Sequence, residues 1–528
     1  MRYCSVVLLS VVLLPVLGLP VYCPAAVPVG SVFDVRDYGA SGLREENATQ
    51  AIQAAVDACH RAGGGMVYVG PGEYTTGLIQ LRDHVNLHLE AGATLLLSQD
   101  RGDFPNRGRS LIYAEGARNI AVTGRGRING LAEYDYTGMR GQDPEIAEEI
   151  DIARQAGVEL KRYYRSSERV NVYMFILNEC TDVRLEDITV INSPLWTVRL
   201  NDCDRVFIRG VHIYSDLEKG VNADGIDIVS SSNVIISDSL IVTADDAIVL
   251  KTIPRNGRVK PIENVTVTNC ILTSSSTAMM IGTETHADIR HVVFSNCVIR
   301  DSNKGFGINV QDGATVSDVI FTNITMDLNR RHWNWWGSAE TFKFILKKRT
   351  PESKLGAIRD VVIDNVISHA RGTSTITGHP ERRLENIKIS NLQIFMQPEN
   401  KPDKRATHAI HACGVNGLTL RDVSVKWTEE QFEPKWASAL VLGNVLNFDI
   451  DRFSGRQGLM EGSAPAVLLY ECTDGIIRDC RANENCGTFL HVTGEQTRNI
   501  RLRDNDLEEA DQQVSFEQES LREKVTWE

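Results

Sequence analysis

Three aspartates carry the clearest chemical signal in this sequence. The stretch GVNADGIDIVSSSNVIISDSLIVTADDAIVLKT, which begins at Gly220, places a lone acid at Asp224 and an adjacent pair at Asp245 and Asp246. Carboxylates crowded on one wall repel one another and raise at least one pKa, as a general acid near neutral pH requires. In glycoside hydrolysis one carboxyl protonates the leaving oxygen while a carboxylate activates water. The three acids are therefore catalytic candidates; ordinary turn aspartates and a calcium site are the alternative interpretations.

A short repeat dominates the sequence around these acids and predicts the elements that position them. Each unit reads as two short alternating strands separated by one turn residue. Successive units begin at residues 204, 232, 263, 290 and 317 with DRVFIRGVHI, SNVIISDSLI, ENVTVTNCIL, RHVVFSNCVI and SDVIFTNITM. A unit of this length needs neighbours above and below to bury its apolar side chains. The pattern predicts an all-β solenoid, a parallel β-helix, because the leucine spacing and helical half of leucine-rich repeats are absent.

The repeat also predicts that Asp224 and Asp245 lie close together. They are 21 residues apart, close to one coil, so they can occupy adjacent rungs roughly 5 Å apart. An asparagine recurs at one turn position, at Asn269, Asn296, Asn323, Asn365 and Asn391. Asparagine tolerates the left-handed conformation of tight bends, so these side chains are expected to stack as a hydrogen-bonding ladder.

The chain divides into a leader, one large domain and a polar tail. Residues 1–26 combine Arg2, an apolar run and small residues, which predicts a signal peptide and a secreted or periplasmic protein. The β-helix is expected over residues 30–507, capped by an amphipathic helix from about Ala48 to Arg61. Segments at about 133–170 and 327–358 interrupt the repeat as loop insertions, and 508–528 is expected to be a polar C-terminal cap or tail.

Composition limits the possible partners. The 528 residues are 42% hydrophobic and 24% charged, with a net charge of −13, which argues against nucleic acid as a partner. No later segment is apolar enough for a membrane span, and a monomer is expected. No phosphate loop, zinc-protease motif or nucleophile elbow is present, so no cofactor or metal is expected.

Nine of the eleven cysteines lie beyond the leader. Cys180 and Cys203 occupy the same place in two successive repeats, as do Cys270 and Cys297. No close CxxC pairing is present, so structural zinc is not predicted. Although secretion permits disulfides, this placement favours stacked, reduced and buried thiols.

The motifs NADGIDI and ADDAIVLKT resemble the NTDGxD and GDDAI(A)LK motifs of the polygalacturonase-like glycoside hydrolases, family 28, in the pectin-lyase-like superfamily. Similarity extends to VFDVRDYGASG, NSPLWTV and IGTETHADIRHVVFSN. The resemblance implies a right-handed parallel β-helix and an inverting, metal-free single displacement. It assigns Asp245 as the general acid and Asp224 and Asp246 as the pair that positions and deprotonates water. Asn222 would orient Asp224, and Asp227 would tie down the turn.

Two family motifs are altered in this sequence. The usual GHG, which places a histidine near the general acid, aligns with Ser276–Ala278, and the carboxylate-gripping RIK aligns with Gly307–Asn309. Without that arginine and lysine, recognition of galacturonate in the central subsite loses its paired cation. The nearest candidates to rebuild the substrate site are Lys251, Glu284 and His286.

Aromatic residues are further candidates for binding sugar. Trp333 and Trp336 lie in the second insertion among arginines, and Trp196 follows NSPL one coil before Asp224. Such rings stack on sugars, although packing against the coil is an equal alternative. The sequence thus predicts a secreted glycosidase that acts on a pectic or related polysaccharide. A calcium-dependent polysaccharide lyase and a non-catalytic carbohydrate-binding β-helix remain the alternatives.

Overall fold

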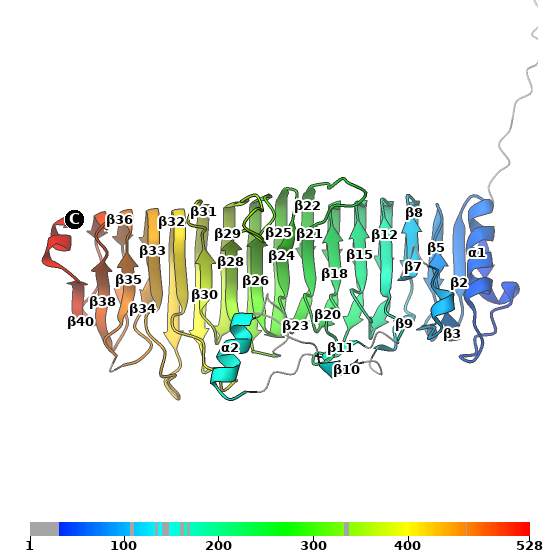
Figure 1. The fold of residues 1–528 in the computed structure, drawn as a ribbon, viewed down its shortest axis with the longest axis horizontal. Coiled ribbons are helices and arrows are strands. Elements are labelled where there is room, and N and C mark those ends of the chain that lie inside the picture. The colour runs from blue at the N-terminus through cyan, green and yellow to red at the C-terminus, as the bar shows by residue number, and fades with distance from the viewer. Residues whose placement is uncertain are drawn as a thin grey trace, which may run out of the picture.

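The computed structural model describes residues 31–105, 110–132, 136–139, 147–158, 163–165, 169–331, 337–460 and 462–528. They form a right-handed parallel β-helix, a straight stack of coils that runs from α1 (Thr49–Arg61) to the C-terminus (Figure 1). The predicted fold class is therefore confirmed. The predicted signal peptide lies outside the described residues.

Each coil contributes a strand to three faces, and each strand pairs in parallel with its counterpart one coil along. The first face includes β12 (Tyr173–Asn178), β15 (Val198–Asn201), β18 (Ile226–Val229), β21 (Ile248–Thr252), β24 (Met279–Thr285), β26 (Lys304–Val310), β28 (Glu340–Leu346) and β30 (Ser374–Thr377). The second face includes β13 (Thr181–Glu186), β16 (Asp204–Arg209), β19 (Ser232–Ser237) and β22 (Ile262–Thr268). The third face includes β14 (Thr189–Ile191), β17 (His212–Tyr214), β20 (Leu240–Thr243) and β23 (Ile271–Ser274).

Further along, single long strands serve both the second and third faces. They are β25 (Ile289–Ser302), β27 (Thr315–Leu328), β29 (Ala357–Ala370) and β31 (Leu384–Met396), and β32 (Ile410–Trp427) begins on the first face and continues through the other two. The turn after the third face leads back to the first face in every coil. It is the turn that carries the candidate acids.

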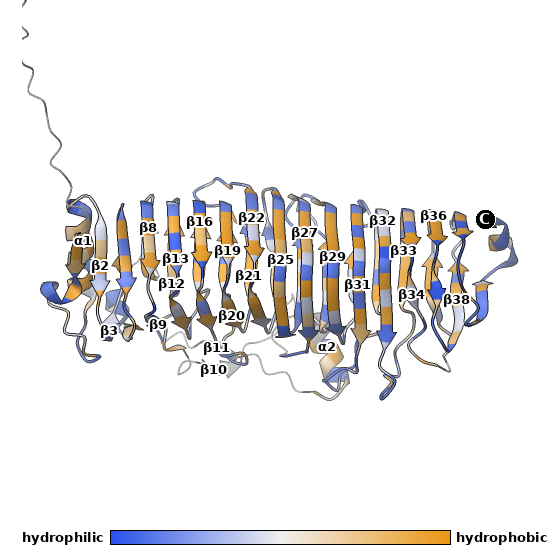
Figure 2. Ribbon diagram, turned by 180° about the vertical axis from the view of Figure 1, so that it is seen from behind, coloured by the Kyte–Doolittle hydropathy of each residue, from blue (hydrophilic) through white to orange (hydrophobic). Residues whose placement is uncertain are grey.

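Inward side chains form continuous apolar columns along the helix axis. One column on the first face consists of Phe175, Val198, Ile226, Ile248, Met279, Phe306 and Phe342, each at most 2% exposed. Burial of each such side chain contributes roughly 1.5–3 kcal/mol. Figure 2 shows the resulting alternation of hydrophobic and hydrophilic bands along the strands. Helix α1 packs Ile52, Val56 and Cys59 against the N-terminal coil, which confirms the predicted cap.

The asparagine ladder is confirmed in the middle of the stack. All five predicted asparagines have positive φ angles between 51° and 55°. Asn323 Nδ2 donates to Asn296 Oδ1 at 3.0 Å, and Asn365 Nδ2 donates to Asn323 Oδ1 at 2.8 Å. At one end an aspartate replaces the next asparagine, and Asn269 donates to Asp238. At the other end Asn391 donates to Asp364, the residue before Asn365.

The nine cysteines among the described residues form no disulfide, and eight of them are buried. The predicted reduced thiols are therefore confirmed. Burial raises the pKa of Cys59 to about 11, so its thiol stays protonated.

Two predicted boundaries are wrong. Residues 340–346, placed inside the second insertion, form β28, an ordinary first-face strand, because ETFKFIL buries alternate side chains in register with β26. The coil also continues past residue 507. Strand β40 (Ala510–Phe516) pairs with β38 (Cys486–Thr493), and β41 (Val525–Trp527) pairs with β39 (Arg498–Arg503). Residues 508–528, predicted to be a polar cap or a tail, therefore supply a last coil.

The first insertion leaves the stack as expected. It contains α2 (Ala147–Gln155) and an antiparallel pair, β10 (Tyr136–Met139) and β11 (Tyr163–Arg165), which forms a sheet separate from the coil (Figure 1). Among the described residues, no helix is long and apolar enough to cross a membrane.

Candidate active site

The three candidate acids meet at the turn between the third and first faces. Strand register pairs Ile226 with Ile248, so Asp224 and Asp246 occupy matching positions on adjacent coils, with Asp245 one residue earlier. The backbone N–H of Gly225 donates to Asp246 O at 2.9 Å and fixes this register. One carboxylate oxygen from each of the three acids lies within 4.8 Å of the others. The predicted placement on adjacent rungs is confirmed.

All three carboxyls are buried. Asp224 is 1% exposed, Asp245 7% and Asp246 8%. Burial, followed by repulsion from Asp224 and Asp246, holds the pKa of Asp245 well above its usual range. A carboxyl that keeps its proton near neutral pH is able to act as a general acid.

A cation beside Asp224 opposes the effect of burial on its pKa. Its Oδ2 accepts a hydrogen bond from Lys251 Nζ at 3.2 Å, and the same Nζ donates to Asp227 Oδ1 at 3.0 Å. Burial raises the pKa of Asp224 to about 6, against the lowering effect of Lys251. A carboxyl with this pKa is largely ionised at pH 7 and suits a general base. Its Oδ1 is also buried and has no hydrogen-bond partner among the described residues.

The third acid is held by two residues to which the sequence analysis gave no role. Asp246 Oδ1 accepts a hydrogen bond from Ser276 Oγ at 2.7 Å and another from the backbone N–H of Thr277 at 3.0 Å. These residues occupy the altered GHG position. If the strand register had been known, the position of the Ser276 hydroxyl one coil beyond Asp246 would have identified this residue.

Lys251 and Trp196, both predicted to bind substrate, contact each other. Lys251 Nζ lies 3.8 Å from the centroid of the Trp196 ring, and Arg199 Cζ lies 5.0 Å from the same centroid. The Tyr173 and Trp196 rings pack edge to face, with their centroids 5.8 Å apart. Cation–π contacts in a desolvated site are favourable by about 2 kcal/mol. Lys251 is only 7% exposed, and its ammonium lies between the acids and the Trp196 ring.

The remaining predicted residues lie at varying distances from this centre. Glu284 is half-buried on β24 and interacts electrostatically with Lys251. His286 is more exposed, and its Nε2 lies 3.8 Å from Asp312 Oδ2, a carboxylate already paired with Arg349. Asn222 is exposed with φ 64°, and among the described residues it makes no hydrogen bond to Asp224. Trp333 and Trp336 lie outside the described residues.

The altered RIK position carries no cation, but the strand on the next coil does. Gly307 of β26 pairs with Lys343 of β28, so the next coil presents an ammonium on the outer surface of the first face. Asn309, the last residue of the altered motif, is buried, and its Oδ1 has no partner among the described residues. The sequence analysis missed Lys343 because this residue lies in the segment that was assigned to the second insertion.

Carboxylate oxygens are the ligands that hard cations prefer, so the acid cluster has the donor type for calcium. Lys251 already places a positive charge against one of the three acids. The donor set therefore fits an acid–base pair with an internal counter-ion better than an all-carboxylate metal cage.

Comparison with known protein families matches residues 59–331 to the family described as Glycosyl hydrolases family 28. Among curated proteins, the chain is 28% identical to a probable polygalacturonase of Vitis vinifera over 41% of this chain and 43% of that protein. It is 25% identical to the exo-poly-alpha-D-galacturonosidase of Dickeya chrysanthemi over 42% of each. The chain thus spans about two fifths of the length of these relatives.

Solved structures share the fold. A family 28 exopolygalacturonase of Yersinia enterocolitica superposes with TM-score 0.62 at 19% identity, over 80% of this chain and 79% of that chain. The exopolygalacturonase of Thermotoga maritima superposes with TM-score 0.58 at 22% identity, over 69% of this chain and 87% of that chain.

Proposed function

Because the chain belongs to glycosyl hydrolase family 28, we propose that it hydrolyses O-glycosidic bonds of a pectic or related polysaccharide. Asp245 protonates the leaving oxygen, and Asp224 and Asp246 position and deprotonate the attacking water. The observation that carries this proposal is the cluster itself, three buried carboxyls with oxygens within 4.8 Å of one another. Environments that separate their pKa values divide the acid and base roles.

We propose a single displacement with inversion of the anomeric centre. Asp224 and Asp246 face each other across adjacent coils, so two carboxylates besides the general acid can hold one water. The carboxyl separation is shorter than the roughly 6.5–9.5 Å common in inverting enzymes, which makes double displacement the second candidate. Proton NMR of the first product decides between them, since inversion gives the opposite anomer to the substrate and retention gives the same one.

The proposed reaction is tested by product release from a panel of pectic and algal polysaccharides and oligosaccharides. We expect new reducing ends without ultraviolet absorbance from unsaturated sugars. Asp245→Asn should reduce the rate by about 10²–10⁴-fold, the usual contribution of a general acid. The matched control is Asp238→Asn, an exposed turn aspartate on the second face. Unsaturated products would establish a lyase instead, and no product across the panel would favour a binding protein.

We also propose that the protein is exported and acts as a monomer. The leader sequence at residues 1–26 supports export. Expression with the native leader, followed by N-terminal sequencing of the exported protein and light scattering, tests both points. An uncleaved N-terminus or a dimeric mass would overturn the corresponding part.

A further inference from the structure

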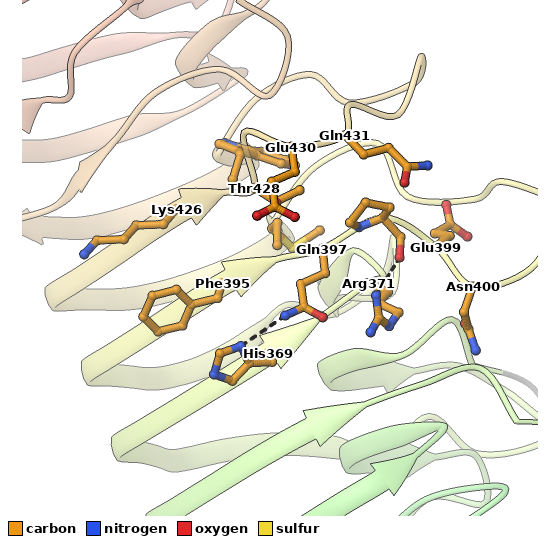
Figure 3. Close-up of a pocket in the computed structure, with 13 residues that line it drawn as sticks. His369, Arg371, Phe395, Gln397, Glu399, Asn400, Lys426, Thr428, Glu430 and Gln431 are labelled. Atoms are coloured by element: carbon orange, nitrogen blue, oxygen red, sulfur yellow. Dashed lines mark hydrogen bonds between the residues drawn. The ribbon is translucent and has the colours of Figure 1, made fainter.

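A second cavity lies on the same edge of the β-helix as the acids, but further toward the C-terminus (Figure 3). Its volume is about 790 Å³, within the range of small-molecule sites. Third-face side chains of β29, β31 and β32 form one wall, and the turns after those strands form the other. These turns are four to six coils beyond Asp245, roughly 20–30 Å along the axis. The cavity is therefore separate from the candidate active site.

A buried ion cluster makes the turn wall rigid. Arg330 Nη2 lies 2.7 Å from Asp403 Oδ2, and Arg405 Nη2 lies 2.8 Å from the same oxygen. Glu399 Oε1 accepts hydrogen bonds from the backbone N–H groups of Arg405 and Ala406 at 2.6 and 2.7 Å. These contacts fix the turn that carries Pro398 and Asn400, so the wall is formed before any ligand arrives.

Arg371 offers an unused donor to this cavity. Its Nε donates to Asn329 Oδ1 at 2.8 Å and its Nη1 to Pro398 O at 2.7 Å, which fixes the guanidinium plane. Among the described residues Nη2 has no partner. Burial lowers the pKa of Arg371, and the carboxylate of Asp327 opposes this shift. A carboxylate placed there would gain a charge-assisted bond at little ordering cost.

Gln397 and the stacked rings of His369 and Phe395 complete the lining. Gln397 Nε2 bonds His369 Nδ1 at 3.3 Å, which leaves the amide oxygen available beside Arg371 (Figure 3). The Phe395 ring stacks on His369 with centroids 4.9 Å apart, and Lys426 Nζ lies 5.7 Å from its centroid. Neighbouring coils thus occupy the ring faces, so the ring presents its edge to the cavity. The lining combines two cations, Arg371 and Lys426, two carboxylates, Glu399 and Glu430, an amide and an apolar surface. A sugar likewise presents both polar and apolar surface.

We propose that this cavity is a second carbohydrate-binding site that takes a uronate unit of a polysaccharide. Arg371 holds the sugar carboxylate, Gln397 bonds a hydroxyl, and Phe395 contacts the ring. The choice of a polysaccharide as ligand rests on the proposed function. A chain held here and at the acids would be tethered at two points, which raises its effective concentration at the active site.

The neighbouring hollow limits how the polymer lies. This hollow shares Lys426 and Trp427 with the cavity that contains Arg371. It is lined by more acids than cations, namely Glu429, Glu484, Asp506, Glu508 and Glu509 against Lys426, Arg456 and Arg481. Such a surface repels a polyanion. The bound chain therefore extends from Arg371 toward the candidate active site and away from the C-terminal end.

The test measures binding directly in the full-length Asp245→Asn protein by isothermal titration calorimetry with an oligogalacturonate. We expect two binding sites. Adding Arg371→Gln should remove one, or weaken it by about tenfold or more, as loss of a charge-assisted bond implies. Because Arg371 also supports two turns, Lys426→Gln provides a second variant with an exposed side chain and should weaken the same site. Arg209→Gln, an exposed arginine on the second face, is the matched control and should leave both sites intact.

The outcomes separate this inference from the proposed function. Loss of one site in the Arg371→Gln and Lys426→Gln proteins supports the inference even if the wild-type protein hydrolyses nothing. Unchanged titrations in both variants overturn it even if hydrolysis is confirmed. Equal binding of a neutral oligogalactose at this site would overturn the role of the carboxylate. Full competition by sodium sulfate alone would show a general anion site and overturn the sugar assignment.

Discussion

Lys251 Nζ lies 3.2 Å from Asp224 Oδ2, and both side chains are almost completely buried. The ammonium offsets part of the cost of burying the Asp224 carboxylate and keeps its pKa at about 6 rather than higher. This pair explains why the rise in the pKa of Asp224 is limited. On the next coil, burial and repulsion from Asp224 and Asp246 hold the pKa of Asp245 well above its usual range.

Replacing Lys251 with methionine should shift the acidic limb of the pH–rate profile. The acidic limb of kcat/KM reports the base, so activity should rise as pH increases through about 6 in the wild-type protein. Without the ammonium, the pKa of Asp224 rises further and the limb should move up by about one pH unit or more. Lys260→Met, an exposed lysine, is the control. An unmoved limb would show that Asp224 does not govern it.

Replacing the Asp245 carboxyl with an amide should stabilise the protein more at neutral than at acidic pH. The folded-state pKa of Asp245 is raised, so between its usual value of 3.8 and that raised value the native state binds more protons than the unfolded state. Stability from this group therefore falls as pH rises. In calorimetric scans, Asp245→Asn should raise Tm on the order of 1–2 °C at pH 7.5, and less at pH 4.5. A larger gain at the lower pH would contradict the assignment.

Loss of the Ser276 hydroxyl should impair catalysis through Asp246. Ser276→Ala removes one of the two hydrogen bonds to Asp246 Oδ1, a loss of about 1–1.5 kcal/mol, so kcat/KM should fall about tenfold. Ser276→Thr restores a hydroxyl and should recover most of the rate. The neighbouring Ser275→Ala, which loses only a bond to Leu217 O, is the control. Equal losses in the two alanine variants would mean that the turn, and not Asp246, is affected.

The asparagine ladder predicts a difference between alanine and glycine at position 323. Asn323 has φ 55° and bonds both Asn296 and Asn365. Asn323→Ala loses these bonds and pays about 1–2 kcal/mol for a left-handed backbone, whereas Asn323→Gly loses the bonds alone. Urea denaturation should therefore rank the wild type above the glycine variant and the glycine variant above the alanine variant. Equal midpoints for the two variants would show that the backbone relaxes there.

Several features followed from the sequence because they depend on local pattern. Apolar residues alternate within each repeat, and the repeat length is close to one coil, so the β-helix, its capping helix and the asparagine turns were predictable. The spacing of Asp224 and Asp245 also placed them on adjacent coils, since one coil is the unit of register. Local pattern was less informative where a loop and a strand lie close together, which is why β28 and the last coil were missed.

Only the tertiary structure decided which partners each acid has. Register places Asp246 opposite Asp224, brings Ser276 from the next coil to Asp246, and aims Lys251 at Asp224. It likewise brings together the walls of the second cavity from turns that are unrelated in sequence. The contacts among the acids, Lys251 and Ser276 join residues 22 to 30 positions apart through side-chain direction and burial. Proton affinity depends on those distances and on exclusion of water, neither of which residue types and spacing alone determine.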